Sequence, residues 1–373
     1  MRPAWLEIDL GVVRGNYRAL RATVGAGCEV IPIVKANAYG HGLVPVTRAL
    51  EEEGVGRVGV ALAEEGIMLR EAGVKCGILV LGASLPEEAE GIVQHELAQS
   101  VCTAEAARAL SREAERRGKP ARVEIKVDTG MGRIGIRPEE VGGFLEGCSG
   151  MRGIEVEGIW SHLATADEED GSYAEEQFRC FRECLKLKER ARGLRFHLCN
   201  SAGIVNHSEM WLDGVRPGLL LYGIKPAARE RVKIGYRAAM ALRSKLNFVK
   251  KVRKGEGLSY GRTFVAEREM VVGTVPVGYA DGYPRSLSNV GEVLFRGERA
   301  AIVGRVCMDQ FLVDLTRYPD ARIGEEVVLM GKQGEAEITA REVAERAGTI
   351  ANEILSRMGE RLPRVYKEES ASL

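Results

Sequence analysis

The feature that most constrains the fold of this chain is a regular alternation over its first two-thirds. Short runs rich in β-branched residues are separated by longer amphipathic stretches. The strand-like runs are Val30–Val34, Val58–Leu62, Ile78–Leu81, Ala98–Cys102, Arg122–Val127, Glu157–His162, Arg195–Cys199 and Leu219–Tyr222. Eight strand–helix units in about 225 residues are typical of a (β/α)8 barrel, a TIM-like α/β fold.

The clearest helix pattern between these strands runs from Ser172 to Arg192. Ser172 and Glu175 form a capping-box pattern at its start, and Gly193 is available to end it. We therefore expect an amphipathic helix over this range. Its apolar face is predicted to carry Phe178, Phe181, Cys184 and Leu185.

After Lys225 the rhythm changes to short strands joined by turns, without helices between them. The expected strands are Lys245–Val252, Met270–Val277, Glu292–Phe295, Ala300–Val306, Gln310–Leu315 and Glu326–Met330. A late helix begins at a second capping box, Thr339 and Glu342, and runs towards Gly348. The sequence thus predicts two domains, a barrel over residues 1–235 and a mostly antiparallel β domain over residues 236–373.

Composition excludes several classes of protein. Lys+Arg and Asp+Glu both number 53, so the chain lacks the general positive charge of a protein that wraps nucleic acid. No apolar stretch approaches the roughly 20 residues of a membrane span, and Glu7 and Asp9 interrupt any secretory signal. The eight cysteines show neither a CxxC pair nor zinc-like spacing. We expect a cytoplasmic protein with reduced thiols, no metal, no nucleic-acid partner and no membrane.

The run RVEIKVDTG at residues 122–130 places charges where a barrel strand has its inner face. Val123, Ile125 and Val127 alternate with Glu124, Lys126 and Asp128. Because helices cover the outside of a barrel, we expect the apolar face outward and the charges inward. Unpaired buried charges are costly, so these should form a paired network. An ordinary edge strand with one solvent-exposed face fits the alternation equally well.

Other polar residues follow predicted strands on different sides of the barrel. Lys35 directly follows the run VIPIV, His162 lies near the end of GIWSHL and Arg216 lies in VRPG. Strand ends carry the chemistry in barrels of this kind. Ser201, in the segment FHLCNSAG, can open a helix, and Gly218 and Leu219 follow Arg216. These residues are placed to hold a phosphate through backbone N–H groups and a helix start.

Two glycine patterns match the form GxGxxG. The pattern at Gly54–Gly59 precedes a strand, the reverse of a dinucleotide-binding turn. The pattern at Gly130–Gly135 follows a strand, with Glu155 about twenty residues on, and keeps a nicotinamide-dependent alternative open. Its helix is expected only near Pro138, too late to direct an N-terminus at a pyrophosphate.

Eight motifs, in order along almost the whole chain, resemble the bacterial alanine racemases. In the barrel they are VKANAYGHG at 34–42, KVDTGMGRIG at 126–135, HLATAD at 162–167, NSAG at 200–203 and VRPGLLLYG at 215–223. In the β domain they are SYGRTF at 259–264, VGYADGYPR at 277–285 and GRVCMDQ at 304–310. The resemblance implies an isomerase that racemises alanine and supplies D-amino acid for peptidoglycan.

The resemblance also implies pyridoxal 5′-phosphate at the barrel mouth, covalently attached through Lys35. The residues that match cofactor contacts are Lys35, Tyr39, His162, Asn200, Ser201, Arg216, Gly218, Leu219, Tyr222 and Asn352. The Arg216 guanidinium would face the pyridine nitrogen. Since arginine keeps its own protons, it leaves that nitrogen unprotonated, which should favour simple reprotonation at Cα over transamination.

By the same resemblance, racemisation needs two acid–base groups on opposite faces of the substrate. Lys35 would serve the D enantiomer. Tyr260, from the partner chain of a head-to-tail homodimer with a shared active site, would serve the L enantiomer. A phenol needs positive neighbours to act as a base, and His162 and Arg216 are the candidates. Residues matching substrate contacts are Arg133, Met308, Asp309 and Asn352, while Lys126 matches a lysine that many members carbamylate.

One position departs from the family pattern. Where the family usually reads INYE, this chain has Ile350, Ala351, Asn352 and Glu353. Losing the tyrosine ring opens space and places an amide near the substrate Cβ, where serine carries its hydroxyl. Members that racemise serine, including those tied to vancomycin resistance, are similar in carrying Asn there. We therefore expect activity on serine beside alanine. The competing interpretation is that Asn352 is a tolerated substitution and alanine is still preferred.

The sequence leaves three alternative functions open. The first is a racemase whose main substrate is serine. The second is a barrel decarboxylase using the same cofactor, and the third is a single-barrel cofactor-binding regulator without turnover. The motifs at 34–42 and 304–310 disfavour the decarboxylase, and Tyr260 with the β domain disfavours the regulator.

Overall fold

The computed structural model describes residues 2–189 and 193–368. They form two compact units. The first contains residues 13–38 and 43–236, and the second contains residues 2–12, 39–42 and 237–368. The N-terminal strand therefore belongs with the C-terminal half of the chain, because β1 (Ala4–Asp9) pairs with β10 (Met240–Lys245) and β20 (Arg364–Lys367).

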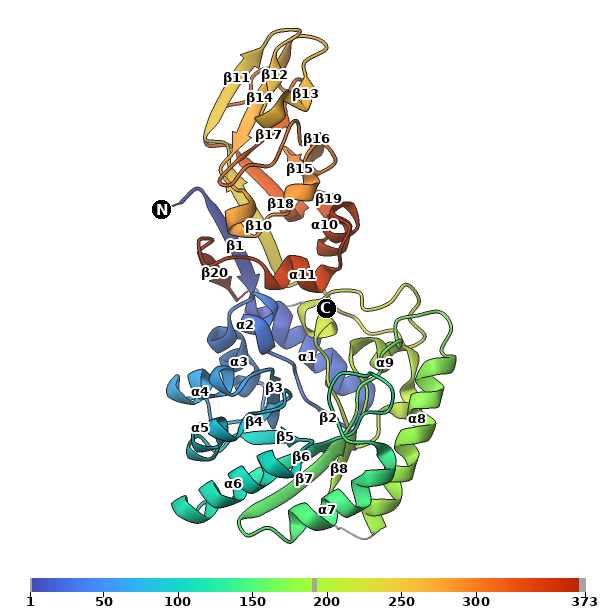
Figure 1. The fold of residues 1–373 in the computed structure, drawn as a ribbon. Coiled ribbons are helices and arrows are strands. Elements are labelled where there is room, and N and C mark those ends of the chain that lie inside the picture. The colour runs from blue at the N-terminus through green and yellow to red at the C-terminus, as the bar shows by residue number, and fades with distance from the viewer. Residues whose placement is uncertain (1, 190–192, 369–373) are drawn as a thin grey trace. The chain divides into compact units, whose positions relative to one another are not determined.

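The first unit is an eight-stranded parallel barrel, as the alternation predicts (Figure 1). Neighbouring strands follow in the order β2-β9-β8-β7-β6-β5-β4-β3, and a parallel bridge from Ile33 to Gly59 closes the ring. The strands are β2 (Glu29–Val30), β3 (Arg57–Val60), β4 (Gly77–Val80), β5 (Ala98–Val101), β6 (Ala121–Lys126), β7 (Ile154–Trp160), β8 (Arg195–His197) and β9 (Gly214–Val215).

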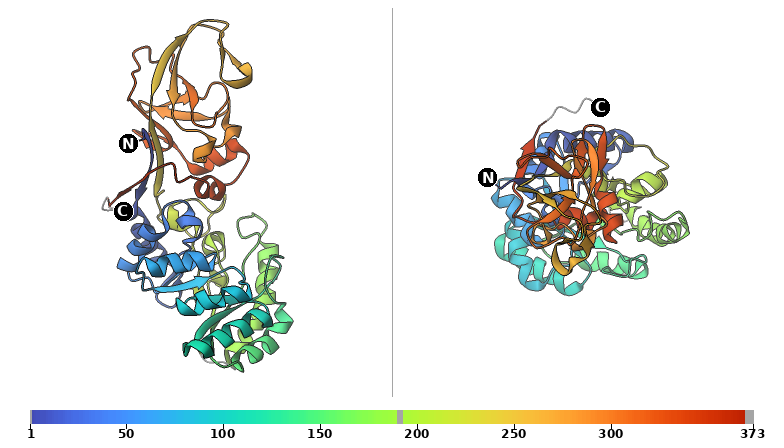
Figure 2. Two further views of the ribbon diagram at one scale, coloured as in Figure 1. Left: turned by 60° about the vertical axis from the view of Figure 1, so that its left-hand side comes forward. Right: turned by 90° about the horizontal axis from the view of Figure 1, so that it is seen from above.

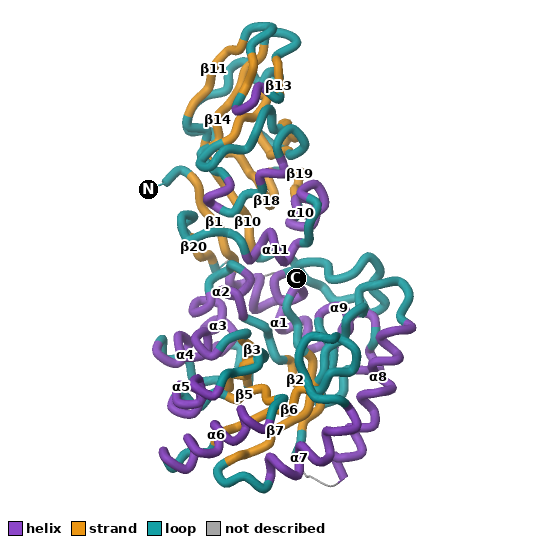
Figure 3. The backbone as a smooth tube through the Cα atoms, in the orientation of Figure 1, coloured by secondary structure: helices purple, strands orange, loops and turns teal. Residues whose placement is uncertain are grey.

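Helices cover the outside of these strands (Figures 2 and 3). They are α1 (Leu10–Val24), α3 (Leu43–Glu52), α4 (Ala63–Glu71), α5 (Ala89–Gln94), α6 (Ala104–Arg117), α7 (Val141–Ser149), α8 (Ser172–Leu185) and α9 (Ser201–Asn206). Each buries an apolar face against the sheet. In α6, for example, Ala107 and Leu110 are buried, Thr103 caps the start and Gly118, with φ of 64°, ends the helix.

Two details of the barrel differ from the sequence prediction. The run Leu219–Tyr222 is a 3₁₀ turn, so its assignment as the eighth strand is wrong and Gly214–Val215 takes that place. The cap of α8 is also wrong, because Gly171 precedes the helix and Ser172 is already in it. α8 ends at Leu185 and a 3₁₀ turn continues to Glu189, while 190–192 lie outside the described residues.

The second unit is mostly antiparallel, as predicted. Its larger sheet has the order β16-β15-β18-β10-β1-β20, with β19 on β18, and a second sheet has the order β11-β14-β17. A two-stranded ribbon joins β12 (Gly257–Leu258) to β13 (Phe264–Val265). The other elements are β11 (Phe248–Val252), β14 (Met270–Val275), β15 (Glu292–Phe295), β16 (Glu298–Ala301), β17 (Phe311–Asp314), β18 (Glu326–Gln333), β19 (Ala336–Ile338), α10 (Ala340–Ala347) and α11 (Ala351–Ser356).

The late helix begins after Thr339, as predicted, but the capping box is only half formed, because the Glu342 carboxylate pairs with Arg299 rather than with the Thr339 N–H. Thr339 accepts a hydrogen bond from the Glu342 N–H, and Gly348 ends α10 with φ of 74°. Among the described residues no helix is long and apolar enough to cross a membrane. All eight cysteines are free thiols.

Candidate active site

A chain of buried charges fills the barrel interior, as the alternation in β6 predicts. Glu124 has no exposed surface and bonds on one side to Arg57 and on the other to His197, at 2.7 Å. Arg57 also reaches Glu29, at 3.0 Å. Burial raises the pKa of the Glu124 carboxyl, but His197 and Arg57 outweigh it and hold that pKa well below its usual range. The network therefore keeps Glu124 ionised inside the barrel.

His197 connects Glu124 to Arg216 through hydrogen bonds at its two ring nitrogens. The guanidinium donates from Nη1 to His197 Nδ1, and from Nη2 to the Ser161 and Leu198 carbonyls, at 2.6 and 2.9 Å. Because arginine can only donate, His197 Nδ1 is the acceptor and its Nε2–H donates to Glu124. Burial lowers the pKa of His197 to about 4, which agrees with this neutral tautomer.

His162 lies on the other side of the same guanidinium. Its Nδ1 is 3.3 Å from Arg216 Nη2 and must accept, so its proton is on Nε2. Burial lowers the pKa of His162, and the positive charge of Arg216 lowers it further. Burial also lowers the pKa of Arg216 to about 10, which leaves arginine positive at neutral pH. The site thus offers a fixed cation and an N–H donor side by side.

Lys126 is the most perturbed lysine of the site. Only 2% of it is exposed, and its Nζ donates to the Val127 carbonyl at 2.6 Å and lies 4.9 Å from the centre of the Trp160 ring. Burial, followed by the charge of Arg216, lowers its pKa to about 7. A large share of Lys126 is therefore the free amine near neutral pH, a form able to react with an electrophile.

The loop after β6 carries Arg133. Asp128 Oδ1 accepts the N–H groups of Gly130 and Gly132, at 2.9 and 3.1 Å. Asp128 therefore folds this loop from a position beyond the strand and is half-buried, so its predicted place inside the barrel is wrong. Arg133 is exposed, yet its charge lowers the pKa values of Lys35, Lys126 and His162.

Lys35 begins a left-handed turn, α2 (Lys35–Tyr39). Ala36, Asn37 and Ala38 have φ of 52, 55 and 54°, and Tyr39 has φ of 51°. Left-handed backbone costs about 1–2 kcal/mol for each residue with a Cβ, so other bonds must hold this turn. Burial lowers the pKa of Lys35, as does the charge of Arg133, while Glu65 raises it.

The predicted phosphate contacts form a second cluster in the barrel. Asn200 caps α9 by accepting the Gly203 N–H at 2.9 Å, so α9 begins at Ser201, as expected. Ser201 Oγ accepts the N–H groups of Gly218, at 2.9 Å, and of Leu220, at 3.3 Å. Its hydroxyl proton remains to be donated. Leu219 lies in this turn, and the buried Tyr222 at its end donates to the Ile33 carbonyl at 2.9 Å.

The second unit carries the other predicted residues. Tyr260 follows Ser259, whose φ is 60°, and Ser259 Oγ donates to the Arg305 carbonyl at 2.8 Å. Tyr260 is 73% exposed and Met308 is 53% exposed. Asp309 bonds to Arg361 at 2.7 Å. A loop with left-handed backbone at Ser259 thus carries the exposed phenol of Tyr260, and a separate loop carries Met308 and Asp309.

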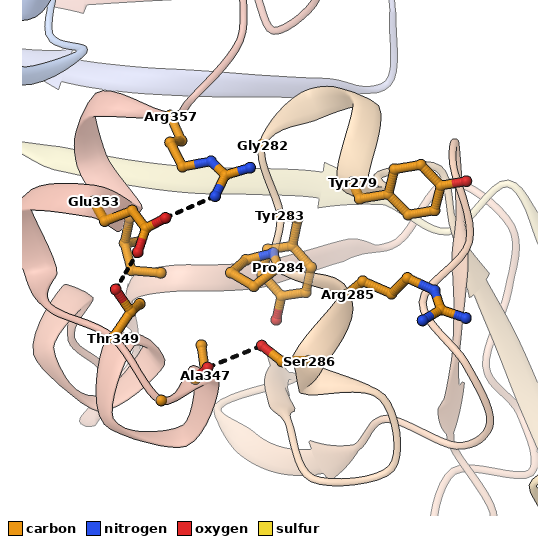
Figure 4. Close-up of a pocket in the computed structure, with 12 residues that line it drawn as sticks. Tyr279, Gly282, Tyr283, Pro284, Arg285, Ser286, Ala347, Thr349, Glu353 and Arg357 are labelled. Atoms are coloured by element: carbon orange, nitrogen blue, oxygen red, sulfur yellow. Dashed lines mark hydrogen bonds and ion pairs between the residues drawn. The ribbon is translucent and has the colours of Figure 1, made fainter.

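Asn352 lies in the first turn of α11, next to Glu353, and is half-buried. Nearby, a pocket of about 340 Å³ lies in this unit (Figure 4). Glu353 bonds there to Thr349 and, at 2.7 Å, to Arg357. None of the predicted site residues lines this pocket.

Sequence reasoning missed Arg57, Trp160 and Glu65. Arg57 lies in the glycine pattern at Gly54–Gly59, which was considered only as a dinucleotide-binding turn, although an arginine that opens an apolar strand is a signal of buried pairing. Trp160, two residues before His162, stacks on His197 at 5.8 Å and lies under Arg216 at 4.6 Å. Glu65 shows no signal in the sequence, because its contact depends on the left-handed turn.

Comparison with known protein families and structures adds to this geometry. Residues 8–226 match the family model described as alanine racemase, N-terminal domain, and residues 239–366 match alanine racemase, C-terminal domain. The alanine racemase of Halothermothrix orenii is 44% identical over 371 residues, which cover 99% of this chain and 98% of that protein. That of Symbiobacterium thermophilum is 44% identical over 377 residues, 100% of this chain and 99% of its own.

Solved structures agree with the sequence relatives. The alanine racemase of Clostridium difficile 630 superposes with a TM-score of 0.93 at 35% identity, covering 99% of this chain and 97% of that chain. The structure of alanine racemase from Bacillus anthracis with bound L-Ala-P has a TM-score of 0.92 at 37% identity, covering 100% of this chain and 96% of that one. Both units of the present chain lie within these matches.

Proposed function

This chain belongs to the alanine racemase family, and we propose on that basis that it interconverts L- and D-alanine with pyridoxal 5′-phosphate held in its barrel. The observation that carries the proposal is the set of cations and N–H donors around Lys35. Lys35, Lys126, Arg133 and Arg216 interact electrostatically there, with His162 as a neutral donor beside Arg216. Such a site is suited to an anionic ligand.

The donor set fits the cofactor. Ser201 has two acceptor bonds filled and an O–H left to donate, which suits a phosphate oxygen at the start of α9. Gly218 and Leu219 would supply backbone contacts beside it, with Tyr39 and Asn200 as further candidates. The phenol of Tyr222 is committed to Ile33, so its role would be to hold the turn that forms the phosphate site.

When bound, the cofactor supplies an electron sink for the carbanion at the substrate Cα. Arg216 would face its ring nitrogen. Three bonds from Nη1 and Nη2 to His197, Ser161 and Leu198 fix the guanidinium plane, and the side chain stays positive near neutral pH. Because arginine gives up no proton, the ring would remain unprotonated and reprotonation at Cα would be favoured over transamination.

Two groups would move the Cα proton. Lys35 Nζ, with its pKa lowered by burial and by Arg133, is suited to accept or return a proton on one face. Tyr260 Oη would act on the other face. The 73% exposure of Tyr260 and the 53% exposure of Met308 support a homodimer in which these residues complete the site of the partner subunit.

The substrate carboxylate would bind Arg133 and the segment containing Met308 and Asp309. We propose that Lys126 is carbamylated. Its pKa of about 7 supplies the neutral amine that carbon dioxide requires. The carbamate would give Arg133 and Arg216 an anion in a region that is otherwise crowded with positive charge, and its formation would remove one of the buried cations.

We propose serine as a second substrate on the strength of Asn352. An amide in the first turn of α11 can hydrogen-bond a hydroxyl, whereas the tyrosine usual in the family fills more space. The chemistry that Lys35 and Tyr260 provide at Cα is the same for both amino acids. Substrate preference would therefore depend on the group at Cβ alone.

The direct test measures D-enantiomer formation from L-alanine and from L-serine with purified enzyme saturated with pyridoxal 5′-phosphate. The proposal predicts D-alanine, with measurable D-serine. Release of carbon dioxide without racemisation would identify a decarboxylase instead. Tight cofactor binding without turnover of either amino acid would identify a binding protein.

A further inference from the structure

Hydrogen bonds made by its own residues contribute to the left-handed turn after Lys35. Ala38 N–H donates to the Val34 carbonyl at 2.7 Å, and Asn37 Oδ1 accepts the Leu43 N–H at 2.7 Å. Asparagine tolerates this backbone region, whereas Ala36 and Ala38 do not favour it. The direction in which Lys35 projects depends on this turn, so whatever fixes Ala36 also fixes the lysine.

Glu65, in the first turn of α4, supplies such a bond from a different βα unit. Its Oε1 accepts the Ala36 N–H at 2.6 Å. Its Oε2 accepts the N–H groups of Ala61, at 2.8 Å, and Leu62, at 3.3 Å. One carboxylate therefore ties the turn after Lys35 to the loop that follows β3, and its charged oxygen makes the bond to Ala36 a strong one.

The next βα unit contains a second glutamate, Glu88, whose hydrogen bonds can be compared with those of Glu65. The sequence Leu62–Ala63–Glu64–Glu65 is repeated in form by Leu85–Pro86–Glu87–Glu88. There Glu88 Oε2 accepts the Leu85 N–H at 2.6 Å, the same reach back to the start of a helix. Helix capping thus explains Oε2 in both glutamates. It does not explain the bond from Glu65 Oε1 to Ala36.

We propose that Glu65 is a positioning residue for Lys35, holding the left-handed turn so that Nζ projects into the barrel mouth; the inference rests on the proposed role of Lys35. Glu65 also acts through its charge, since it raises the pKa of Lys35 against the effect of Arg133 and Arg216. Its loss should therefore disturb both the orientation of the lysine and the pH at which Nζ becomes a base.

The first readout is hydrogen–deuterium exchange of the full-length protein, with and without cofactor, in the peptide containing Ala36. Glu65→Gln places an amide NH₂ beside backbone N–H donors and so loses at least one of the bonds. Exchange at Ala36 should rise roughly tenfold or more, the effect of losing a hydrogen bond to a charged group. Glu88→Gln, the matched control, weakens an equivalent cap and should leave Ala36 unchanged.

The second readout separates turnover from binding in the cofactor-loaded enzyme. Glu65→Gln should lower kcat roughly tenfold or more, with a smaller change in KM, because a misdirected base slows proton transfer more than substrate binding. It should also move the acidic limb of the pH profile to lower pH, since Lys35 loses a negative neighbour. Glu88→Gln should resemble the wild type in both respects.

Glu65→Asp keeps the negative charge but has a side chain shorter by one methylene. It replaces Glu65→Gln in these experiments if that variant does not fold. It should raise Ala36 exchange and lower kcat while leaving the pH profile close to that of the wild type. Ala36 exchange or kcat in the Glu65 variants equal to that in Glu88→Gln would overturn the proposal. A wild type without racemase activity would refute the proposed function instead, and the exchange comparison would still decide whether Glu65 holds the turn.

Discussion

Arg216 donates to Nδ1 of His197, and this one bond fixes the protonation of the imidazole. A guanidinium has no acceptor, so His197 must be neutral with its proton on Nε2, where Glu124 accepts it. Because the barrel interior buries His197 completely, protonating it would break the bond to Arg216. The charge of the barrel mouth and the stability of the fold are therefore linked through this histidine.

This linkage predicts a pH dependence of stability. The folded pKa of His197 is lowered to about 4, from an ordinary value of 6.5, and that of His162 is lowered as well. Between those pH values the unfolded chain binds more protons, so the free energy of unfolding should fall as pH drops from about 6.5 to about 4. Urea midpoints measured across this range should show the fall. His197→Gln should reduce its slope, and an unchanged slope would contradict the assignment.

The buried carboxylate of Glu124 should be far more important for stability than a carboxylate nearer the surface of the same sheet. Glu124→Ala leaves Arg57 without its buried partner and should cost about 3–5 kcal/mol, the usual penalty for breaking a buried pair. Glu157, on the adjacent strand β7, pairs with Arg195 nearer the surface. Glu157→Ala should cost about 1 kcal/mol or less. Urea denaturation of the two variants compares them, and equal losses would mean that Glu124 is not a buried link.

Lys126 should carry a carbamate when carbon dioxide is present. Its pKa of about 7 leaves much of the amine neutral near neutral pH, whereas an ordinary lysine is almost fully protonated there. Carbon-13 NMR of protein equilibrated with labelled bicarbonate should show a carbamate signal that Lys126→Gln abolishes. A wild-type spectrum without that signal would show that Lys126 stays a plain lysine.

Asn352→Tyr should depress serine turnover more than alanine turnover. The ring removes both the amide and the space near the substrate Cβ, so the hydroxyl of serine loses a partner and gains a clash. Serine kcat/KM should fall by roughly tenfold or more relative to alanine, the effect of about 1.4 kcal/mol. Kinetics on both amino acids provide the measurement. An equal effect on the two substrates would mean that Asn352 does not determine specificity.

Much of the barrel was predictable because its alternation is local. The alternation of charges in β6 correctly identified Glu124 and Lys126 as buried, since residues two apart on a strand lie on the same face. The run Leu219–Tyr222 was misread, because a short apolar run looks the same as a buried strand or a buried turn. The glycines on both sides of this run and the preceding Pro217 were the features of the sequence that indicate a turn.

Non-local features could not be predicted. β1 pairs with β10 and β20, which lie more than 200 residues away in sequence, and no local pattern reports such a partner. The left-handed turn at Ala36 and Ala38 uses residues that do not favour that backbone, so its support by Glu65 appears only in three dimensions. The motif around Lys35 identified the lysine but not what holds it.

In the proposed enzyme, one active site uses Lys35 of one chain and Tyr260 of the other. Lys35→Ala and Tyr260→Phe proteins should each form little D-alanine from L-alanine. When the two variants are mixed and their subunits exchanged, each mixed dimer has one site with both residues intact, and D-alanine formation should return to a substantial fraction of the wild-type rate. If the mixture stays as inactive as its parents while the wild type racemises alanine, the shared site is refuted.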